Sequence, residues 1–400
     1  MVYSVIIIGG GFSGLCAGVS LGRVLSNKVL ILEANKRVGK KILATGNGQG
    51  NITNTVVNTT KYHGDISLVE KSLQKFSNNH LIDFFDDLGL LMDERDGKIY
   101  PASYTASSVL DVLRFEIQKL NVKIETEKIV TAIKKTSVFE LTCADGSKFY
   151  SHKVILAFGG KSGAGFFTDG KSYSLATSLG HSITKLAPSL VQLKCNKEKI
   201  KGLKGIKQEA KVGLYGDKRH IVSFCGDILF TDYGISGNSI FSLSAYLNGI
   251  TNPYVIIEFL PNHSEKLLCE KLIKKCKNHI TWEELLISYL PARLNIIMLK
   301  ECGLNHLECA NAKHVERVVK TIKEFKLEIL GTAGFENSQV TSGGLCTSEF
   351  DSNTLQSKKV KNLYAIGECL NVDGDCGGYN LQWAFTSAMI AAKEILDEES

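Results

Sequence analysis

The sequence contains no run of about 18 consecutive apolar residues, the length that an α-helix needs to cross a bilayer. Its first residues, MVYSVIIIGGG, include neither a basic leader nor the longer apolar run of a signal peptide. From these two absences we expect a soluble protein that stays in the cytoplasm and has no membrane partner.

The 11 cysteines include no C-x-x-C pair, so the common zinc patterns are excluded. An odd, scattered set of cysteines without a secretion signal indicates reduced thiols, and we expect no metal site. Proline is scarce, with 5 residues, whereas there are 37 glycines. Many glycines with few prolines indicate tight turns and close backbone approaches rather than extended linkers.

Strong charge of either sign is also lacking, because 47 Lys and Arg residues oppose 41 Asp and Glu residues and leave a net charge of +6. The densest basic stretch spans residues 194–211, which hold seven lysines and no aromatic residue. Aromatic side chains usually accompany the basic residues of a nucleic-acid surface. We therefore interpret this stretch as a solvated basic face in preference to a nucleic-acid site.

The N-terminal residues follow the pattern of a βαβ unit. Residues 2–8 are continuously apolar and β-branched, which predicts a buried parallel strand, and GGGFSG follows them. A helix is expected over residues 13–25 and a second strand over 28–32. This succession occupies about thirty residues, the usual length of such a unit. Farther along the chain, the apolar pattern predicts helices over residues 65–90 and 106–120, a β-meander over 122–150 and a helical stretch over 265–327.

The G-x-G-x-x-G turn and the acid after the second strand predict a dinucleotide site. Gly9 permits a tight turn, Gly11 lets the backbone approach a pyrophosphate, and Gly14 allows close packing of helix on strand. The helix that starts at Phe12 and Ser13 offers N–H groups to the phosphates. Glu33 follows Leu32 and could accept the ribose hydroxyl hydrogens. The motif does not by itself distinguish FAD from NAD.

Two further segments have the composition of a ring- and phosphate-binding site. The first, KKILATGNGQGNITN at residues 40–54, supplies small and amide residues that could lie against a flat ring. The second, GECLNVDGDCGGYNLQWAF at residues 367–385, places two glycines before a predicted helix, which forms another phosphate- or ring-facing helix N-terminus. Asp373 in this segment could bind a ribityl hydroxyl.

Taken together, these segments resemble the BaiN/YhiN-type, aminoacetone-oxidase-like family of FAD-dependent flavoproteins, and the resemblance covers nearly the whole chain. KILATGNGQGNITN is similar to the family pattern K-x-L-x-S-G-N-G-R-C-N-x-T-N. QVTSGG, GECLNVDG and GGYNLQWAF match its C-terminal signature. The chain departs from the pattern at Gln49 and Gly50, where the family has Arg and Cys.

The resemblance implies FAD as the cofactor and an α/β fold with a discontinuous Rossmann-like FAD-binding domain of the glutathione-reductase type. Its position-by-position transfer implies FAD contacts at Gly9, Gly11, Phe12, Ser13, Gly14, Glu33, Lys41, Gly46, Asn47, Gly48, Asn51, Thr53, Asn54, Val130, Gly160, Gly367, Glu368, Asp373, Gly378, Tyr379, Asn380, Leu381 and Gln382. We expect the FAD domain at 1–186 and 331–400, a β-barrel-like insert at 187–264 and a helical subdomain at 265–330.

The predicted function is an FAD-dependent oxidoreductase that acts on a small organic substrate by two-electron transfer at the flavin. No second G-x-G-x-x-G has a strand–helix context, so a dedicated NAD domain is not expected. This leaves an ene-type reductase that NAD(P)H visits transiently, or an amine or aminoketone oxidase that O2 reoxidises. A tRNA-modifying flavoprotein and a non-catalytic flavin-binding or redox-sensing module are the alternatives. The sequence assigns no catalytic residue; Tyr100, Tyr233 and Tyr379 are candidate proton donors by position only.

Overall fold

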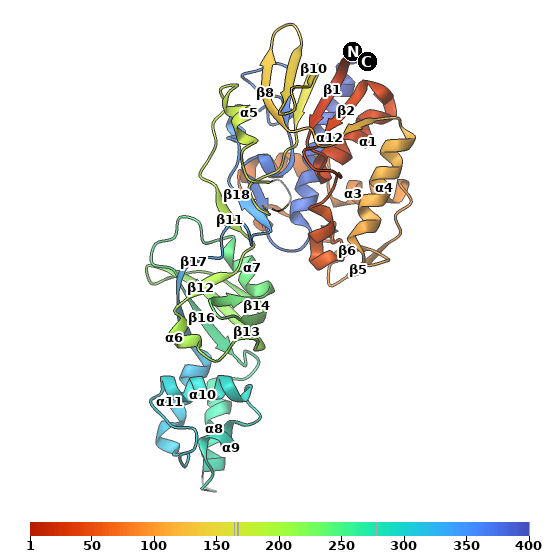
Figure 1. The fold of residues 1–400 in the computed structure, drawn as a ribbon. Coiled ribbons are helices and arrows are strands. Elements are labelled where there is room, and N and C mark those ends of the chain that lie inside the picture. The colour runs from red at the N-terminus through yellow and green to blue at the C-terminus, as the bar shows by residue number, and fades with distance from the viewer. Residues whose placement is uncertain (164, 166–167, 277–278, 400) are drawn as a thin grey trace. The chain divides into compact units, whose positions relative to one another are not determined.

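The computed structural model describes residues 1–163, 165, 168–276 and 279–399, and the chain forms two compact units. The first unit combines Met1–Ser189 with Phe335–Ser400, and the second consists of Leu190–Gly334. The first unit is therefore discontinuous: Figure 1 shows ribbons from both ends of the colour bar, red and blue, within it. The predicted division into an FAD domain, a β-barrel-like insert and a helical subdomain, with the bounds given above, stays a prediction.

A seven-stranded sheet forms the centre of the first unit, in the order β7-β2-β1-β10-β9-β8, with β19 also paired to β10. The neighbours β7, β2, β1, β10 and β19 run parallel, whereas β9 is antiparallel to both β10 and β8. The strand bounds are β1 Val2–Ile8, β2 Val29–Leu32, β7 Lys123–Glu125, β8 Val130–Lys135, β9 Phe139–Cys143, β10 Lys148–Leu156 and β19 Leu363–Ala365. The inner residues of β1 and β2 are fully buried, as expected for a parallel sheet covered on both faces.

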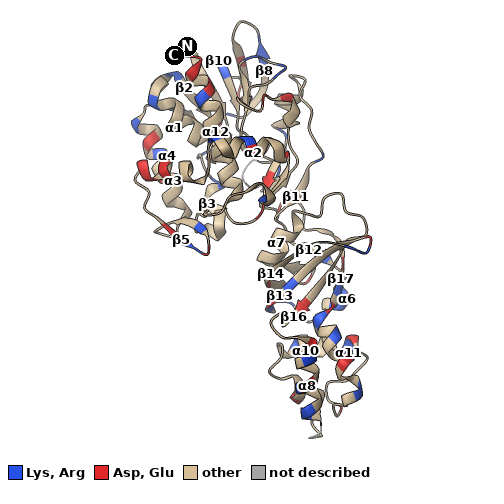
Figure 2. Ribbon diagram, turned by 180° about the vertical axis from the view of Figure 1, so that it is seen from behind, with Lys and Arg blue, Asp and Glu red and all other residues tan. Residues whose placement is uncertain are grey.

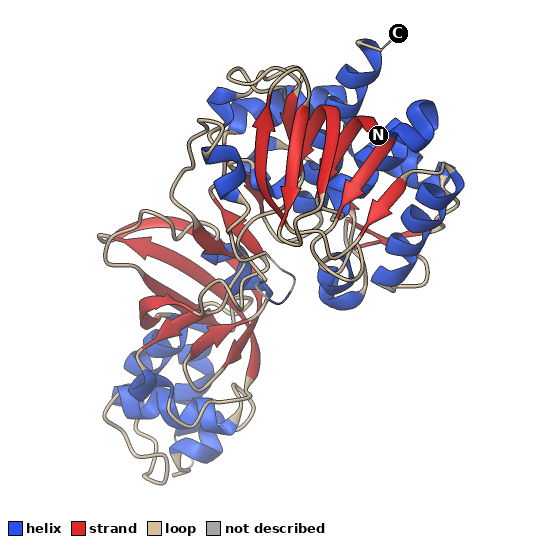
Figure 3. Ribbon diagram, turned by 45° about the horizontal axis from the view of Figure 1, so that its top comes forward, coloured by secondary structure: helices blue, strands red, loops and turns tan. Residues whose placement is uncertain are grey.

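Helices from both ends of the chain pack around this sheet (Figure 3). The C-terminal helix α12 lies against α1, and α1 also contacts α4. The helices of this unit are α1 Phe12–Leu25, α2 Ile66–Lys75, α3 Asn78–Asp87, α4 Ala106–Lys119, α5 Tyr173–Thr177 and α12 Tyr379–Asp397. α12 is buried over most of its length because its apolar residues belong to the same core as the sheet.

Three small sheets complete the first unit and carry the loops that matter below. The first has the order β3-β6-β5, and the other two are the antiparallel pairs β20-β4 and β11-β18. Their bounds are β3 Thr53–Asn54, β4 Tyr62–Gly64, β5 Met92–Arg95, β6 Lys98–Pro101, β11 Ala187–Ser189, β18 Val340–Ser342 and β20 Val372–Gly374.

The second unit contains a closed barrel of strands in the order β12-β15-β14-β13-β16-β17. The strands are β12 Leu193–Cys195, β13 Lys207–Gly216, β14 Arg219–Phe230, β15 Gly234–Ser236, β16 Tyr254–Phe259 and β17 Phe325–Thr332. The helices are α6 Lys197–Ile200, α7 Asn238–Ser244, α8 Glu265–Cys276, α9 Trp282–Leu286, α10 Ala292–Glu301 and α11 Ala312–Lys323. One hydrophobic core joins barrel residues such as Phe259 to helical residues such as Trp282. The predicted α/β class with an inserted barrel is thus confirmed.

Three local predictions need correction. Residues 122–150 do not form one meander, because β7 leaves it and pairs in parallel with β2. The helix expected over residues 65–90 is two helices, since Ser77 begins α3 with a capping box that His80 completes. The helical pattern expected up to residue 327 ends at Lys323, and Phe325 opens the barrel strand β17.

Candidate functional site

The glycines of the β1–α1 turn each have a distinct geometry. Gly9 has a φ of +111°, and a Cβ there would lie 2.3 Å from the carbonyl oxygen of Ala157. A Cβ on Gly14 would lie 2.0 Å from the carbonyl oxygen of Gly9, so α1 packs closely on the turn. A Cβ on Gly11 would meet no atom within 4 Å. The backbone at Gly11 therefore borders open space, into which a ligand could approach.

The N-terminus of α1 faces that space without a side-chain cap. Gly11 is the N-cap residue, no side chain bonds the first turn among the described residues, and that turn holds no acidic residue. Phe12 and Ser13 are the first helical residues, and both are buried. The first N–H groups of a helix have no partner within the helix, so they remain available to an anion.

Glu33 lies directly beside this turn at the end of β2. Its Oε2 accepts a hydrogen bond of 2.8 Å from the backbone N–H of Gly10, and its Oε1 accepts two from Asn35. Glu33 is buried, with 7% of the residue exposed, and these bonds hold its carboxylate in one orientation. The backbone of Lys128 donates to the carbonyl of Glu33, which places Val130, the first residue of β8, close to the end of β2.

The loop of residues 46–54 has an unusual backbone. Gly46, Asn47 and Gly48 all have left-handed φ values, of 57°, 55° and 85°. Glycine and asparagine adopt this region at the lowest cost, which explains their presence in the segment. The loop ends in Thr53 and Asn54, which form β3.

This loop packs against the turn before α12. The hydroxyl of Thr53 donates to Oε1 of Gln382 at 2.7 Å, and a Cβ on Gly378 would lie 2.6 Å from the Thr53 backbone. Nδ2 of Asn54 donates to the carbonyl of Gly377 at 3.3 Å. Two segments that are more than 300 residues apart in sequence therefore form one continuous structure.

Several of the predicted contact residues use their side chains within the protein. Nδ2 of Asn51 donates to the carbonyls of Thr53 and Ile99, and the amide of Asn380 bonds both the N–H and the carbonyl of Gly374. Gln382 is fully buried. These amides shape the two loops, so contacts of these segments with a ligand would come mainly from the backbone.

Tyr379 and Leu381 begin α12 beside this turn. The hydroxyl of Tyr379 donates to the carbonyl of Val56 at 3.3 Å, and its ring is buried against Tyr62. Leu381 is half-buried and packs against the main core. Both residues fix the start of the helix on the loop.

An ion pair joins the segment of residues 40–54, near its start, to the segment of residues 367–385. Nζ of Lys41 lies 2.6 Å from Oε2 of Glu368, and Oε1 of Glu368 accepts a bond from the N–H of Thr341. A Cβ on Gly160 would lie 2.4 Å from Oγ1 of Thr341, so only glycine fits there. A Cβ on Gly367, which has a φ of +72°, would lie 2.7 Å from Oγ of Ser13, so Gly367 lies against the start of α1.

Thr341 is a residue that the sequence did not single out. It is fully buried, and its hydroxyl accepts bonds from the N–H groups of Lys161 and Ser162. The QVTSGG motif, which contains Thr341, was the feature of the sequence that could have indicated this residue. Residues 164, 166 and 167, which come shortly after Ser162 in the sequence, lie outside the described residues.

Asp373 is a buried carboxyl group without a hydrogen-bond partner among the described residues. It is fully buried on β20, and both of its oxygens lack a donor; the hydroxyls of Ser189 and Ser342 are near but do not reach hydrogen-bonding geometry. Burial raises the pKa of Asp373 to about 6, although nearby His63 acts in the opposite direction. A buried carboxyl without a donor is costly unless a ligand supplies one.

A second group that the sequence did not indicate lies on the paired strand β4. Nε2 of His63 lies 2.9 Å from Oδ1 of the buried Asp375, and Nζ of Lys61 lies 3.6 Å from Oδ2. Burial lowers the pKa of His63, but the bond to Asp375 and the charge of Asp373 together raise it above its usual value. His63 and Asp373 are direct neighbours across the β4–β20 pair.

The part of the chain that the structure describes contains neither a candidate metal-ion cluster nor a helix that could span a membrane. There is no cluster of three or more His, Cys, Asp or Glu side chains that could hold a metal ion. In the same residues, none of the helices combines the length and the apolar character needed to span a membrane.

The family model described as the HI0933-like protein Rossmann domain matches residues 3–394. The chain belongs to this HI0933-like family. The resemblance to BaiN/YhiN-type flavoproteins is therefore confirmed, and the HI0933-like chain is an FAD-dependent oxidoreductase.

Two curated relatives match this HI0933-like protein along its whole length. The 3-dehydro-bile acid delta(4,6)-reductase of Clostridium scindens is 36% identical over 97% of both chains. The ribosomal RNA dihydrouridine synthase of Escherichia coli is 27% identical over 100% of this chain and 99% of the relative.

Two solved steroid dehydrogenases have a similar fold. The 3-ketosteroid Δ1-dehydrogenase of Sterolibacterium denitrificans superposes with a TM-score of 0.53 at 11% identity, covering 99% of this chain and 100% of that one. The 3-ketosteroid Δ4-(5α)-dehydrogenase of Rhodococcus jostii gives 0.51 at 14% identity, covering 98% and 97%. At these identities the likeness establishes the Rossmann-type FAD-binding fold alone.

The residues of the HI0933-like protein fit FAD. Open space in front of Gly11, an uncapped helix N-terminus and the fixed carboxylate of Glu33 are complementary to a pyrophosphate and an adenosine ribose. The unpartnered carboxyl of Asp373 could accept a bond from a hydroxyl. These features of the protein's own residues agree with FAD, the cofactor of the family.

Proposed function

We propose that this protein reduces a carbon–carbon double bond conjugated to a carbonyl group. The observation that carries this proposal is the chemistry shared by two full-length relatives. A 3-dehydro bile acid with Δ4,6 unsaturation has double bonds conjugated to its 3-oxo group, and uracil has a C5=C6 bond conjugated to its C4 carbonyl. In both cases a hydride equivalent adds to a carbon that is electrophilic through conjugation with the carbonyl group, and a proton adds to the other carbon of the reduced double bond.

The geometry described above supports a set of proposed cofactor contacts. The N-terminus of α1, with Gly9, Gly11, Phe12, Ser13 and Gly14, would hold the pyrophosphate, and Glu33 would accept the ribose hydroxyls. The remaining proposed contacts are Lys41, Gly46, Asn47, Gly48, Asn51, Thr53, Asn54, Val130, Gly160, Gly367, Glu368, Asp373, Gly378, Tyr379, Asn380, Leu381 and Gln382.

Bound FAD supplies two-electron transfer at its ring. The chain itself orients the two partners: the 46–54 loop and the turn before α12 present small residues and backbone groups, so that a flat ring can lie against them. NAD(P)H is the proposed electron source, visiting the substrate site without a domain of its own. An oxidase that passes electrons to O2 is the alternative that the first experiment separates.

The test is anaerobic titration of the FAD-loaded protein with NADH and NADPH, followed by a 3-oxo-Δ4 steroid. We expect loss of the flavin absorbance near its visible maximum and its return when the steroid is added, with one saturated product per NAD(P)H. A flavin that NAD(P)H does not reduce, or that neither the steroid nor a uridine-containing RNA reoxidises, would contradict the proposal.

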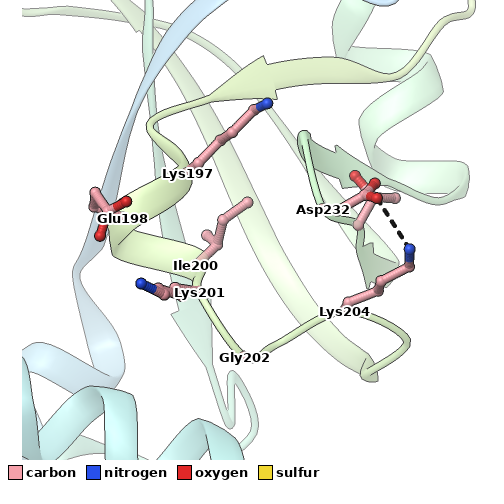
Figure 4. A pocket seen from close by; sticks show the side chains of 8 residues that line it. Lys197, Glu198, Ile200, Lys201, Gly202, Lys204 and Asp232 are labelled. Carbon is pink, nitrogen blue, oxygen red and sulfur yellow. Dashed lines mark hydrogen bonds and ion pairs between the residues drawn. The ribbon is translucent and has the colours of Figure 1, made fainter.

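Uracil in RNA is the second candidate substrate, and the basic residues of the barrel unit favour it. Figure 2 shows basic residues on α6, and Figure 4 shows the side chains that line an adjoining pocket. The volume of this pocket is about 280 Å³. The pocket is lined by Lys197, Glu198, Ile200, Lys201, Gly202, Lys204, Thr231 and Asp232. Lys204 is paired with Asp232, whereas Lys197 and Lys201 have no acidic partner within ion-pair distance among the described residues.

Binding of a ribosomal RNA fragment at increasing salt tests this candidate. If RNA is bound through these lysines, Lys197→Gln with Lys201→Gln should weaken binding and lower the salt dependence by roughly two phosphate contacts. Lys204→Gln is the matched control, because Asp232 already neutralises that lysine. Equal RNA affinity of all three proteins would remove this surface as the binding site.

A further inference from the structure

The three-stranded sheet β3-β6-β5 carries a row of polar and basic side chains on one face. Asn54 is opposite Lys98, and Lys98 is opposite Arg95. Residues directly opposite each other on neighbouring antiparallel strands project to the same face of a sheet. The two cations are therefore neighbours in a row that starts at Asn54.

Arg95 is held in place although it is exposed. One of its guanidinium nitrogens donates to Oε1 of Gln49 at 2.6 Å, and the guanidinium lies over the rings of Tyr100 and Tyr104 at 5.0 and 4.8 Å. Exposed arginines usually sample many rotamers, which is an entropic cost for binding. Here two rings and one amide have already fixed the side chain.

Arg95 also lacks an acidic partner. Asp93, Glu94 and Asp96 are its neighbours in sequence, yet no described carboxylate lies within ion-pair distance of Arg95; Oε1 of Glu94 instead accepts the N–H of Gly97. A guanidinium has five N–H donors, of which Gln49 uses one. The remaining donors are free to bind an oxyanion in a bidentate manner.

Tyr104 adopts a costly backbone conformation at this position. Its φ is +49°, in the left-handed region that a bulky aromatic residue rarely occupies. Such conformations cost about 1 kcal/mol or more and are concentrated at functional sites. The conformation brings the ring of Tyr104 to 5.5 Å from that of Tyr100, and both lie beside Arg95.

The row begins at the loop that we propose to hold the flavin ring. Asn54 bonds the carbonyl of Gly377. Lys98 acts on the preceding residue: burial raises the pKa of the Cys376 thiol, and the charge of Lys98 opposes that rise. Lys98 thus lies within electrostatic reach of the turn before α12. The basic row and the proposed flavin loop share the strand β3.

We propose that Arg95 and Lys98, on the platform of Tyr100 and Tyr104, bind an oxyanion of the substrate and so determine substrate specificity. The ligand chemistry is a carboxylate of a small acid or a phosphate of a nucleotide chain. The inference rests on the proposed function, because it names the substrate group that this site takes. Gln49, which stands where the family pattern has Arg, is the positioning residue that anchors Arg95.

Equilibrium binding to the oxidised, FAD-loaded protein tests the proposal without turnover, with the flavin spectrum as the signal. The probes are a 3-oxo-Δ4 steroid with a side-chain carboxylate, its uncharged methyl ester, and a short uridine-containing RNA. We expect Arg95→Gln to weaken binding of one of the two anionic probes by roughly tenfold to a hundredfold and to leave the ester unchanged. Arg95→Lys should retain part of the affinity, because the charge remains but the planar fork is lost.

Two controls separate recognition from structure. Arg114→Gln removes an exposed arginine that already pairs with Asp111, so it should leave all affinities unchanged. The flavin content and the midpoint of thermal unfolding of Arg95→Gln should equal those of the original protein. If Arg95→Gln loses affinity for the carboxylate probe, the oxyanion belongs to a small acid. If it loses affinity for the RNA probe, the oxyanion is a phosphate.

The proposal is overturned if the protein binds no anionic probe, or if Arg95→Gln binds the acid, the ester and the RNA with unchanged affinity. The proposed function is tested separately. It is contradicted if the protein without substitutions, supplied with NAD(P)H, reduces neither the double bond of the ester nor that of uracil in the RNA. If Arg95→Gln has lost affinity for the anionic probe but still reduces the ester, the result supports both the oxyanion site and the proposed function.

Discussion

At the residue scale, many polar side chains of the site stabilise the protein rather than face a ligand. Asn51, Asn380 and Gln382 each bond a backbone or side-chain group of the two loops. Glu33 and Asp373 differ from them. The first is a carboxylate held at the edge of the glycine turn, and the second is a buried carboxyl group without a described donor. The chemical consequences of single substitutions should therefore be largest at these two acids.

Asp373→Asn should stabilise the FAD-free protein above pH 6. Burial raises the pKa of Asp373 from 3.8 to about 6. The folded state then holds the proton more tightly than the unfolded chain, so stability decreases as the pH rises from about 4 to about 6. We expect the substitution to increase the free energy of unfolding by up to about 3 kcal/mol at pH 7.5 and by little at pH 4.

Urea unfolding of the FAD-free protein at both pH values measures this effect. Asp86→Asn on the exposed face of α3 is the control and should change neither value. If Asp373→Asn increased the free energy of unfolding by the same amount at pH 4 and pH 7.5, the charge of the carboxyl group would not be the cause of the increase.

Glu33→Gln should weaken FAD binding by roughly tenfold to a hundredfold, because a charged acceptor of the ribose hydroxyls is lost. The amide would also direct an N–H toward the donor groups of Gly10 or Asn35. Fluorescence of released flavin during dilution measures the affinity. Glu70→Gln on the exposed surface of α2 is the control, and an equal loss of FAD in both variants would contradict the assigned role.

At the element scale, the β1–turn–α1 unit depends on two glycines for different reasons. Gly14→Ala would place a Cβ 2.0 Å from the carbonyl oxygen of Gly9, a backbone atom that cannot move away. We expect a loss of about 3 kcal/mol or more in the free energy of unfolding. Gly11→Ala meets no atom within 4 Å and should change stability by less than about 0.5 kcal/mol.

FAD affinity separates the two variants further. The methyl group of Gly11→Ala would occupy the space proposed for the pyrophosphate, so affinity should fall while the fold remains intact. Urea unfolding and flavin content of the two purified proteins give both quantities. Normal FAD content in Gly11→Ala would place the pyrophosphate elsewhere.

Elements with a strong local signal were predicted well, and those with nonlocal partners were not. The predicted strand at residues 2–8 is β1, and the helix expected at 106–120 is α4. The helix break at Ser77 was missed because its capping partner is a histidine rather than the usual Glu or Gln. The parallel pairing of β7 with β2 was missed because residues 123–125 are too few to show a pattern.

At the scale of the whole molecule, the first unit should fold without the second. Ser189 pairs with Val340 in the β11–β18 sheet, so the two chain ends created by removing Leu190–Gly334 lie near each other. We expect a protein with a short Gly/Ser linker in place of these residues to be monodisperse and to retain FAD, because all proposed cofactor contacts lie in the first unit.

Gel filtration and the visible spectrum of the truncated protein check this prediction. The anionic probe that depends on Arg95 in the full chain should also depend on Arg95 in this truncated protein if the basic row acts alone. An aggregated or colourless product would show that the barrel unit is required for folding or for FAD.

The sequence alone determined the nucleotide-binding turn, the acid that follows β2, and the family to which the chain belongs. These features depend on backbone conformation over a few residues, such as the φ of +111° at Gly9, and on motifs that are contiguous. Barrel closure by pairing of β12 with β17, the contact of Gln49 with Arg95 and the raised pKa of Asp373 depended on tertiary structure. Each of these requires residues distant in sequence to meet, and burial or pairing then changes their energies in ways that no local pattern contains.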